Sequence, residues 1–317
     1  MDKNILSIII PTYNRSKMLD ECLSHLYVLY QETQFKLIIC NNNSTDETLN
    51  VIKKWEDCFS DLTVVNHDNN LLYDRNFASG YRQVNTEYCW LLGDSNYVDK
   101  ENYRKILDVL ISRRPHSLVL NDADRTLLGD DIIYTDCNQL LYDLGWYTTL
   151  LSSCIIRKEF LSEERYQRYY DTCFLHEGVF LDYLSSIEEF SVHVMPSIHM
   201  SEIRIENKYN SGWRQTPFLV FGKCWFSFIM SLPFKYTVEN KLHCIKEHNR
   251  QRKIFSPRQI FKNKISGRFG YKDYTESRKY LKFVIDTPLI VYDIINIFPP
   301  MPKLLFVMLK LKRLFVG

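Results

Sequence analysis

The chain has 317 residues, 45% of them hydrophobic, and a formal net charge of +2. This length can bury a sizeable core and predicts one domain with an appendage, or two small domains. The nine cysteines form no CxxC pair and show no metal-ligand spacing, and their odd number argues against a disulfide framework. We expect buried free thiols in a reducing cytosol. The first apolar run ends at Pro11, which is too early for a signal peptide.

The charge is distributed unevenly along the chain. Residues 241–317 contain 17 Lys/Arg and 5 Asp/Glu, so this region is strongly basic and the rest of the chain is acidic. A basic region of this kind predicts an anionic partner, either a membrane surface or a nucleic acid.

Strands and helices alternate in the first 121 residues. Ser16 is a candidate cap for the helix that follows the first strand, and Ser44 and Glu47 form a capping-box pattern before the next helix. The alternation predicts βαβ units, and therefore an α/β fold with a mainly parallel sheet and helices on both faces. The predicted strands are Ile5–Ile10, Leu37–Cys40, Leu62–Val65, Tyr88–Leu92 and Ser117–Leu120. The later predicted helices are Tyr73–Val84 and Tyr103–Ile111.

The pattern loosens between Asp122 and Met200, where we predict one helix, Glu177–Glu189. From Thr216 onward the pattern is mostly helical, with interleaved aromatic and basic residues. We therefore predict a first domain over residues 1–215 and a basic, mostly helical region over residues 216–317.

The last thirty residues contain two apolar stretches, Leu289–Phe298 and Leu304–Val316, which are separated by prolines. Neither reaches the roughly 20 residues that a bilayer-spanning helix needs. A basic, amphipathic segment that lies in the membrane interface fits this composition. The alternative is a tail helix that packs on the core of the domain.

Polar segments follow three of the predicted strands. They are PTYNR at residues 11–15, NNNSTDET at residues 41–48 and GDSN at residues 93–96. In an open α/β sheet, ligands bind outside the carboxyl ends of the strands. These segments therefore predict one crevice, and the acidic residue in it predicts a cation or a polyhydroxy ligand.

Together with NNLLYDRNFASGY at residues 69–81, these segments resemble the family 2 glycosyltransferases of the GT-A fold. In particular, they resemble abequosyltransferase-like enzymes of bacterial surface-polysaccharide synthesis. The resemblance covers the first third of the chain and fades beyond Leu120. It implies a GT-A (Rossmann-like) catalytic domain with a mostly helical C-terminal extension. It also implies inverting transfer of one sugar from a nucleotide-sugar donor to a glycan, expected to be a lipid-linked oligosaccharide in O-antigen or capsule synthesis.

The resemblance places the family's acidic D-x-D triplet at Asp94, Ser95 and Asn96. Asp94 is expected to face the ribose or sugar of the donor, and Asn96 takes the position that normally contacts a metal. That metal, Mn²⁺ or Mg²⁺, would stabilise the departing diphosphate as a Lewis acid. Because an amide carries no charge, we expect the metal to bind weakly or to be dispensable.

The same resemblance assigns donor-binding roles around the first two strand ends. Arg15 is expected to reach a phosphate, and Arg75 is a second candidate to offset the charge of the diphosphate. Asn41 and Asn42 stand where the family often has an acid, and their amides can still recognise a base. A plain turn is the alternative interpretation of these asparagines. The expected donor-binding residues are Pro11, Thr12, Tyr13, Arg15, Asn41, Asn42, Arg75, Asp94 and Ser95.

The resemblance also implies a catalytic base on a segment after the donor domain. The segment FLHEGVFLDY, residues 174–183, offers Glu177, which we favour, and His176 and Asp182. Glu177 and His176 open the predicted helix, which suggests a position at the rim of the site. A helix-start acid and a surface histidine explain the same residues without catalysis.

Two other functions stay open. The amides at Asn41, Asn42 and Asn96 also fit a catalytically weak, sugar-nucleotide-binding scaffold protein. The basic segment Arg250–Lys272 fits nucleic-acid binding, but it matches no recognised motif, so we expect no nucleic-acid partner. The expected partners are a nucleotide-sugar donor, a glycan acceptor and a membrane surface that contacts the C-terminal region. The expected location is cytoplasmic, peripheral on the inner face of the cytoplasmic membrane.

Overall fold

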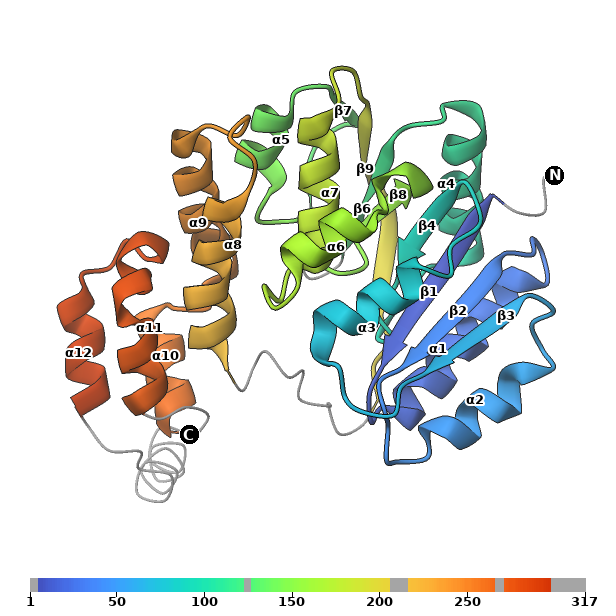
Figure 1. The fold of residues 1–317 in the computed structure, drawn as a ribbon, viewed down its shortest axis with the longest axis horizontal. Coiled ribbons are helices and arrows are strands. Elements are labelled where there is room, and N and C mark those ends of the chain that lie inside the picture. Colours follow the sequence, from blue (N-terminus) through green and yellow to red (C-terminus); the bar gives the residue numbers. More distant parts are fainter. Residues whose placement is uncertain (1–4, 123–126, 206–215, 266–270, 298–317) are drawn as a thin grey trace, which may run out of the picture. The chain divides into compact units, whose positions relative to one another are not determined.

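The structure of the chain is a computed structural model that describes residues 5–122, 127–205, 216–265 and 271–297 (Figure 1). The first part of the chain alternates strands and helices, as predicted. The strands are β1 (Leu6–Thr12), β2 (Lys36–Asn41), β3 (Leu62–Asn66), β4 (Tyr88–Leu91), β5 (Asn96–Tyr97), β6 (Ser117–Asp122), β7 (Ile132–Tyr134), β8 (Cys154–Arg157) and β9 (Val192–Glu202). The helices among them are α1 (Ser16–Tyr30), α2 (Thr48–Glu56), α3 (Leu72–Tyr81), α4 (Lys100–Ser112), α5 (Cys137–Leu144), α6 (Glu163–Tyr169) and α7 (Leu175–Ser186).

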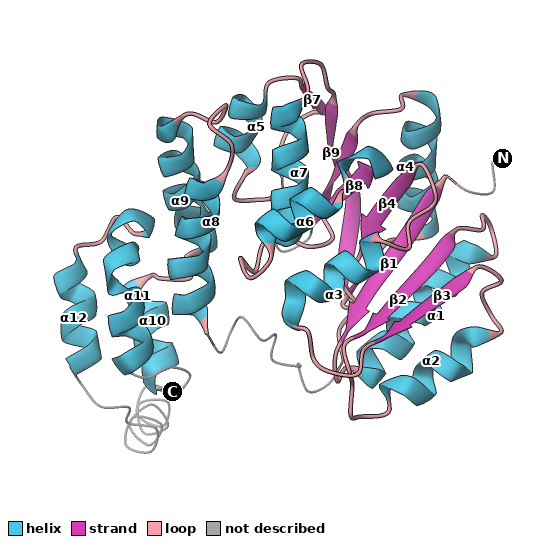
Figure 2. Cartoon of the chain, viewed as in Figure 1, coloured by secondary structure: helices cyan, strands magenta, loops and turns pink. Residues whose placement is uncertain are grey.

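The strands form one nine-stranded sheet in the order β3-β2-β1-β4-β8-β6-β9-β5, with β7 paired to β9 (Figure 2). Strands β3, β2, β1 and β4 are mutually parallel, and β6 is parallel to β9. The predicted parallel sheet is therefore confirmed where the alternating pattern covers it. Strand β8 runs antiparallel between β4 and β6, and the sequence pattern predicted neither β8 nor β9.

Helices cover both faces of the sheet, as expected. Ile8 and Trp90 point into a hydrophobic core that the buried faces of α1, α2 and α4 complete. Ile9 points to the opposite face, where α3 approaches so closely that a Cβ atom on Gly80 would lie 2.5 Å from the Cγ2 atom of Ile9. This approach of α3 to the sheet requires a glycine at position 80. The face of α1 that packs on the sheet is apolar, and its buried residues include Met18, Leu19, Cys22, Leu23, Leu26 and Tyr30.

Two predicted helix caps are wrong. Helix α1 begins at Ser16, but no side chain caps it, and the backbone N–H of Ser16 donates to Asp46 at 3.0 Å. Helix α2 begins beyond both Ser44 and Glu47, so these residues form no capping box. The Ser44 hydroxyl instead accepts a hydrogen bond from the backbone N–H of Asn14 at 2.9 Å. The polar residues after β2 thus bind the loop after β1.

Other predicted elements differ from the structure at their ends. Helix α3 begins at Leu72 and ends at Tyr81, three residues before the predicted end at Val84. Helix α7 begins two residues before the predicted helix at Glu177 and ends at Ser186.

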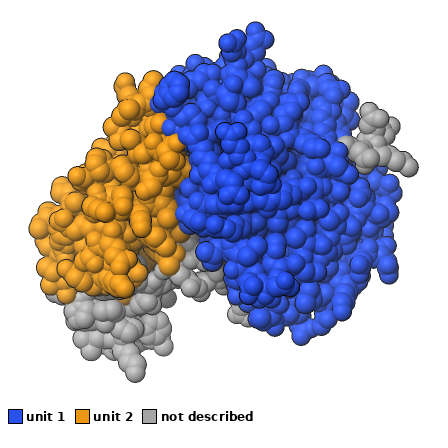
Figure 3. All heavy atoms as spheres, viewed as in Figure 1, with its two compact units in different colours: residues 1–209, 232–236 blue, residues 210–231, 237–317 orange. Residues whose placement is uncertain are grey.

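The chain divides into two compact units, residues 1–209 with 232–236 and residues 210–231 with 237–317 (Figure 3). The boundary that we expect at residue 215 stays a prediction, because residues 206–215 lie outside the described part. The described elements of the second unit are all helical, as predicted. They are a π-helical segment (Phe218–Cys224), α8 (Trp225–Ser231), α9 (Val238–Arg252), α10 (Pro257–Ile265), α11 (Tyr271–Val284) and α12 (Leu289–Ile297).

No described helix combines the length and the apolar character that a membrane crossing requires. The tail segment Leu304–Val316, for which we expect interfacial binding, lies outside the described residues.

Candidate active site

The polar segments after β1 and β4 meet at one edge of the sheet. Because β1 lies between β2 and β4 and all three are parallel, their carboxyl ends share that edge. The Thr12 hydroxyl donates to the Asp94 carboxylate at 3.2 Å. The backbone N–H of Asn42 donates to the carbonyl oxygen of Thr12 at 3.0 Å. The three strand ends are therefore joined by hydrogen bonds.

Asp94 is a buried carboxylate with a cationic neighbour. Its Oδ2 atom lies 3.0 Å from Nε of Arg15. Burial raises the pKa of Asp94 from 3.8 to about 6, and Arg15 and the Thr12 hydroxyl oppose that rise. The Arg15 side chain keeps 21% of its surface exposed, so its charge is accessible to an anionic ligand at this edge.

The side chain of Asn96 is fixed by a serine from a distant loop. The Ser152 hydroxyl donates to Oδ1 of Asn96 at 3.0 Å and accepts from the backbone N–H of Gly93 at 2.9 Å. The carboxamide oxygen of Asn96, which is its only candidate metal ligand, thus already accepts one hydrogen bond. Ser95 lies between the two site residues, and its carbonyl oxygen accepts from the backbone N–H of Ile203 at 2.8 Å.

The amides of Asn41 and Asn42 brace the neighbouring loops. Asn41 donates to the side chain of Asn66 at 3.0 Å and accepts from the backbone N–H of Ser44 at 3.1 Å. Asn42 donates to Oδ1 of Asn70 and to the carbonyl oxygen of Leu72, so both N–H groups of its amide are used. Base recognition by these two residues stays a prediction.

The loop after β1 is anchored through Asn14, whose φ of 52° is in the left-handed region. Its carboxamide oxygen accepts from the backbone N–H of Thr45 at 2.7 Å. Asparagine tolerates this conformation better than most residues. Two further residues of this segment are expected to bind the donor: Tyr13 is 43% exposed, and Pro11 lies within β1 and is partly exposed.

Glu177 lies in the first turn of α7 and is only 1% exposed, so the rim position expected for it is wrong. Its Oε1 atom accepts from the Thr148 hydroxyl at 3.1 Å. Glu177 and His176 line a small cavity together with Leu91 of β4. Leu91 is the last residue of β4, so this cavity lies between α7 and the end of β4, and neither Asp94 nor Arg15 lines it. His176 also faces the carbonyl oxygen of Thr149 at 3.3 Å.

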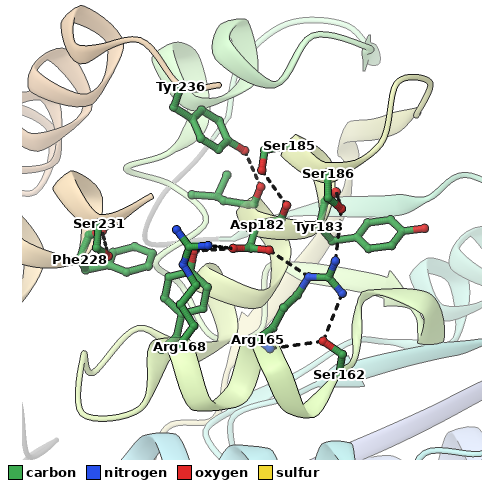
Figure 4. A network of polar contacts seen from close by, with 12 residues as sticks. Ser162, Arg165, Arg168, Asp182, Tyr183, Ser185, Ser186, Phe228, Ser231 and Tyr236 are labelled. Carbon is green, nitrogen blue, oxygen red and sulfur yellow. Dashed lines mark hydrogen bonds and ion pairs between the residues drawn. The ribbon is translucent and has the colours of Figure 1, made fainter. Parts of the chain in front are cut away.

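Asp182 lies further along α7 in a different environment (Figure 4). Its carboxylate accepts from Nε of Arg165 at 3.1 Å and from the Tyr169 hydroxyl at 2.9 Å. The guanidinium of Arg168 lies 3.2 Å away. Two cations and a phenol thus occupy this carboxylate, an arrangement that stabilises the contact between α6 and α7.

Asp74 and Arg75 of α3 hold the loop that leads into α7. The buried carboxylate of Asp74 accepts from the backbone N–H groups of Cys173 at 2.9 Å and Leu175 at 3.1 Å. The exposed guanidinium of Arg75 pairs with Asp171. Asp171 and Cys173 have φ values of 63° and 67°, in the left-handed region. Burial raises the pKa of Asp74 from 3.8 to about 6, and the two N–H donors oppose that rise.

Three residues that contact the candidate site residues or hold the loop before α7 were not predicted from the sequence: Ser152, Thr148 and Asp74. Asp74 could have been found, because it shares the inward helical face of Phe77 and Tyr81, where an acid is unexpected. Ser152 and Thr148 lie in the stretch without clear periodicity and offered no such signal.

Few candidate ligands for a divalent cation lie at this edge of the sheet. The site offers the carboxylate of Asp94 and the amide oxygen of Asn96, and Mg²⁺ is commonly held by one or two carboxylates plus substrate phosphates. Within the described ranges, no group of three or more His, Cys, Asp or Glu residues could hold a metal by itself. These two residues alone therefore offer a cation one charged ligand and one amide oxygen, and that oxygen already accepts from Ser152.

Comparison with known sequences supports the resemblance seen in the motifs. The model of Glycosyl transferase family 2 matches residues 7–122. Abequosyltransferase RfbV of Salmonella typhimurium is 27% identical over 177 residues, which are 49% of this chain and 53% of RfbV. Poly(ribitol-phosphate) beta-N-acetylglucosaminyltransferase TarS of Staphylococcus aureus is 28% identical over 150 residues, which are 41% of this chain and 26% of TarS. The chain thus spans about half, or less, of the length of these relatives.

Solved structures share the fold. Residues 1–349 of S. aureus TarS in complex with UDP-GlcNAc match with a TM-score of 0.57 and 15% identity, covering 86% of this chain and 83% of that one. Mannosyltransferase PcManGT from Pyrobaculum calidifontis in complex with GDP-Man and Mn²⁺ matches with a TM-score of 0.54 and 15% identity, covering 77% and 69%. At these identities the likeness shows the GT-A fold alone.

Proposed function

We propose, from the match of residues 7–122 to the model of Glycosyl transferase family 2, that the protein moves a single sugar from a nucleotide-sugar donor to a glycan acceptor. The observation that carries the proposal is the buried Asp94 carboxylate at the joined strand ends, with Arg15 at 3.0 Å. A carboxylate accepts hydrogen bonds from sugar or ribose hydroxyls, and a guanidinium binds phosphate oxygens.

In the proposed reaction, a hydroxyl of the acceptor attacks the anomeric carbon of the donor sugar. The new carbon–oxygen bond forms while the bond from that carbon to the diphosphate breaks, and the diphosphate leaves with the electron pair. Negative charge grows on the leaving group, and the partly exposed Arg15 is placed to counter it. A single displacement of this kind inverts the configuration at the anomeric carbon.

Glu177 is the proposed base, which takes the proton of the attacking hydroxyl. The hydrogen bond from Thr148 orients its carboxylate within the cavity that reaches the end of β4. His176 lines the same cavity and is the second candidate. Asp182 is the weakest of the three, because Arg165 and Arg168 both lie against its carboxylate.

Mn²⁺ or Mg²⁺ is the proposed cofactor, and when bound it would supply Lewis-acid stabilisation of the diphosphate. Asp94 and Asn96 are the residues that would hold it, together with the donor phosphates. Because only one of the two is charged, the affinity of the protein alone for the cation should be low.

We also propose a lipid-linked oligosaccharide as the acceptor, in the synthesis of a bacterial surface polysaccharide such as O-antigen or capsule. The likeness to an abequosyltransferase supports the polysaccharide setting. The basic C-terminal region supports a peripheral location on the cytoplasmic face of the membrane, where anionic lipids attract Lys and Arg.

A thermal-shift panel with UDP, GDP, CDP and dTDP, each with Mn²⁺ and with chelator, tests the donor site. A ligand that binds only the folded protein raises the melting temperature by mass action. We expect one nucleotide to stabilise the protein, and Asp94→Asn to lose that shift. Asp108→Asn, an exposed aspartate of α4, serves as the matched control and should keep it. The absence of a shift with every nucleotide would contradict the donor site.

Transfer of a labelled sugar from the selected donor then tests the activity. Binding without turnover would favour the second candidate function, a sugar-nucleotide-binding scaffold. One observation supports this candidate. Asn41, Asn42 and Asn96 stand at three positions expected to bind ligand, and their side-chain amides already make hydrogen bonds within the protein.

A further inference from the structure

Helix α12, in the second unit, has its polar residues turned inward and its aliphatic residues turned outward. Asn296 is buried, whereas Ile290, Ile294 and Ile297 are 61, 51 and 73% exposed. Residues at spacings of four and three lie on one face of a helix. These three side chains, the isoleucine stripe, therefore form a continuous apolar strip on the surface of this unit.

The orientation of α12 is fixed by polar contacts with its neighbours. Asp293 accepts from Nη2 of Arg278 at 2.8 Å and from the Tyr274 hydroxyl at 2.6 Å, both on α11. The ammonium of Lys264 on α10 donates to Oδ1 of Asn296 at 3.2 Å. Rotation of α12 that buried the isoleucine stripe would break these contacts. The only acid of the helix is also neutralised, which leaves no negative charge on the stripe.

The surroundings of the stripe are basic. Helices α10 and α11, which pack against α12, together contain seven Lys/Arg and two Asp/Glu, and they expose Arg258, Lys262, Lys272 and Lys282 as well as Asp273 and Glu276. The sequence that follows α12, residues 298–317, contains four Lys/Arg among its apolar residues and no Asp or Glu. Aliphatic and cationic groups are thus combined in the same part of the chain.

We propose that the isoleucine stripe is an interaction surface for an anionic lipid bilayer. Aliphatic side chains on a short helix enter the boundary between headgroups and acyl chains, and nearby Lys and Arg are attracted to anionic headgroups. A nucleic acid would bind the cations through its phosphates, but it would make no use of the exposed isoleucines. The inference deepens the membrane-surface part of the proposed function by naming the residues that make the contact.

Vesicle co-sedimentation of the full chain tests this surface. The vesicles are phosphatidylcholine alone and phosphatidylcholine mixed with phosphatidylglycerol. We expect the wild type to bind the mixed vesicles and the double variant Ile290→Glu/Ile294→Glu to bind them at least about tenfold more weakly. The matched control is Ile133→Glu, at an isoleucine of β7 in the first unit that is 56% exposed, and it should bind like the wild type.

Three outcomes would overturn the proposal. The first is that the wild type fails to bind vesicles, and the second is that it binds neutral and mixed vesicles equally. The third is that the double variant binds as tightly as the wild type. Light scattering of the same proteins tests whether a second copy of the chain binds the stripe instead. A dimer of the wild type that the double variant converts to a monomer would assign the stripe to a second copy of the chain.

The measurement is independent of glycosyl transfer, because it contains neither donor nor acceptor. The melting temperature of each variant reports whether it folds, and its shift with nucleotide reports the donor site separately. Failure of the vesicle experiment and failure of the proposed enzymatic function are thus distinguishable.

Discussion

The carboxylate of Asp74 accepts the backbone N–H of Leu175 at 3.1 Å, and this bond joins α3 to the first turn of α7. The start of α3 is itself tied to the donor side, because Oδ1 of Asn42 accepts from the backbone N–H of Leu71 at 2.8 Å. Helix α3 therefore lies between the loop after β2 and the helix that carries Glu177. The position of the proposed base depends on contacts that begin at the proposed nucleotide site.

Replacement of Asp74 by Asn should slow transfer without weakening donor binding. Asparagine keeps the size of the side chain but presents an NH₂ group to one of the two N–H donors, so the turn that holds Glu177 must shift. We expect kcat to fall about tenfold or more, since small displacements of catalytic groups are costly. The nucleotide-induced thermal shift should stay unchanged. Asp171→Asn, which removes only the exposed pair with Arg75, is the control and should retain activity. Normal kcat in Asp74→Asn would show that the contact is merely structural.

Replacement of Asp94 by Asn should abolish donor binding, and it should make the free energy of unfolding depend less on pH. The folded-state pKa of Asp94, about 6, lies above its ordinary value of 3.8. The folded state therefore holds the proton more tightly, and the stability from this group is complete below pH 3.8 and is lost as the pH rises through 6. The loss is about 3 kcal/mol at most. Denaturant unfolding at several pH values measures this loss. Between pH 3.8 and 6, the free energy of unfolding should decrease less in Asp94→Asn than in the wild type.

The pH dependence of donor binding should have the opposite sign. If ionised Asp94 contacts the donor or its cation, the nucleotide-induced shift rises as the pH increases through about 6. Two results would contradict the role given to this carboxylate. One is a nucleotide-induced thermal shift that is equal at pH 5 and pH 7.5. The other is a free energy of unfolding that depends on pH in the same way in the wild type and in Asp94→Asn.

Replacement of Asn96 by Asp should strengthen the dependence on a divalent cation. The substitution adds a second carboxylate beside Asp94, and the Ser152 hydroxyl can donate to it as it does to Asn96. We expect the difference in thermal shift between Mn²⁺ and chelator to increase, because carboxylates are the preferred ligands of hard cations. Ser95→Asp places the same charge one residue away and should not have this effect. Equal cation dependence in wild type and Asn96→Asp would argue against a metal at this position.

Glu177 and Asp182 should respond differently to amide substitution. Glu177→Gln keeps the acceptor for the Thr148 hydroxyl but cannot take a proton, so we expect transfer to fall by roughly 10²–10⁴-fold with little change in melting temperature. Asp182→Asn leaves two arginines without their counter-ion at a site that is 8% exposed. We expect it to lower the free energy of unfolding by about 3 kcal/mol. Activity in Glu177→Gln at the level of the wild type would remove Glu177 as the base.

The parallel half of the fold could be predicted because its signals are local. The first strand is an uninterrupted apolar run, and the polar residues after β1, β2 and β4 mark one edge of the sheet. Strand β8 offered no such signal, since it has four residues and only Ile155 and Ile156 are well buried. In β9, Pro196 and Ser197 coincide with a shift of register opposite β6, which masks a strand pattern.

The arrangement of the candidate site could be predicted only in part. The proximity of Asp94 and Arg15 could be predicted because each follows a strand at the same edge of the sheet. Ser152 and Thr148 could not, since they reach Asn96 and Glu177 only through the tertiary fold. The burial of Glu177 likewise depends on the loop that packs over α7, which the sequence pattern did not reveal.

Strand β8 lies between β4 and β6 in the sheet, although it follows both in the chain. The segment that matches the family model is therefore shorter than the smallest segment that could fold on its own. The match ends at residue 122, which is also the last residue of β6. The two partners of β6 are β8 and β9, and both come later in the chain. A fragment cut at residue 122 would leave β6 without a hydrogen-bonded neighbour and uncover its six buried residues. Expression of the donor-binding portion alone should therefore extend at least to Glu202, where β9 ends.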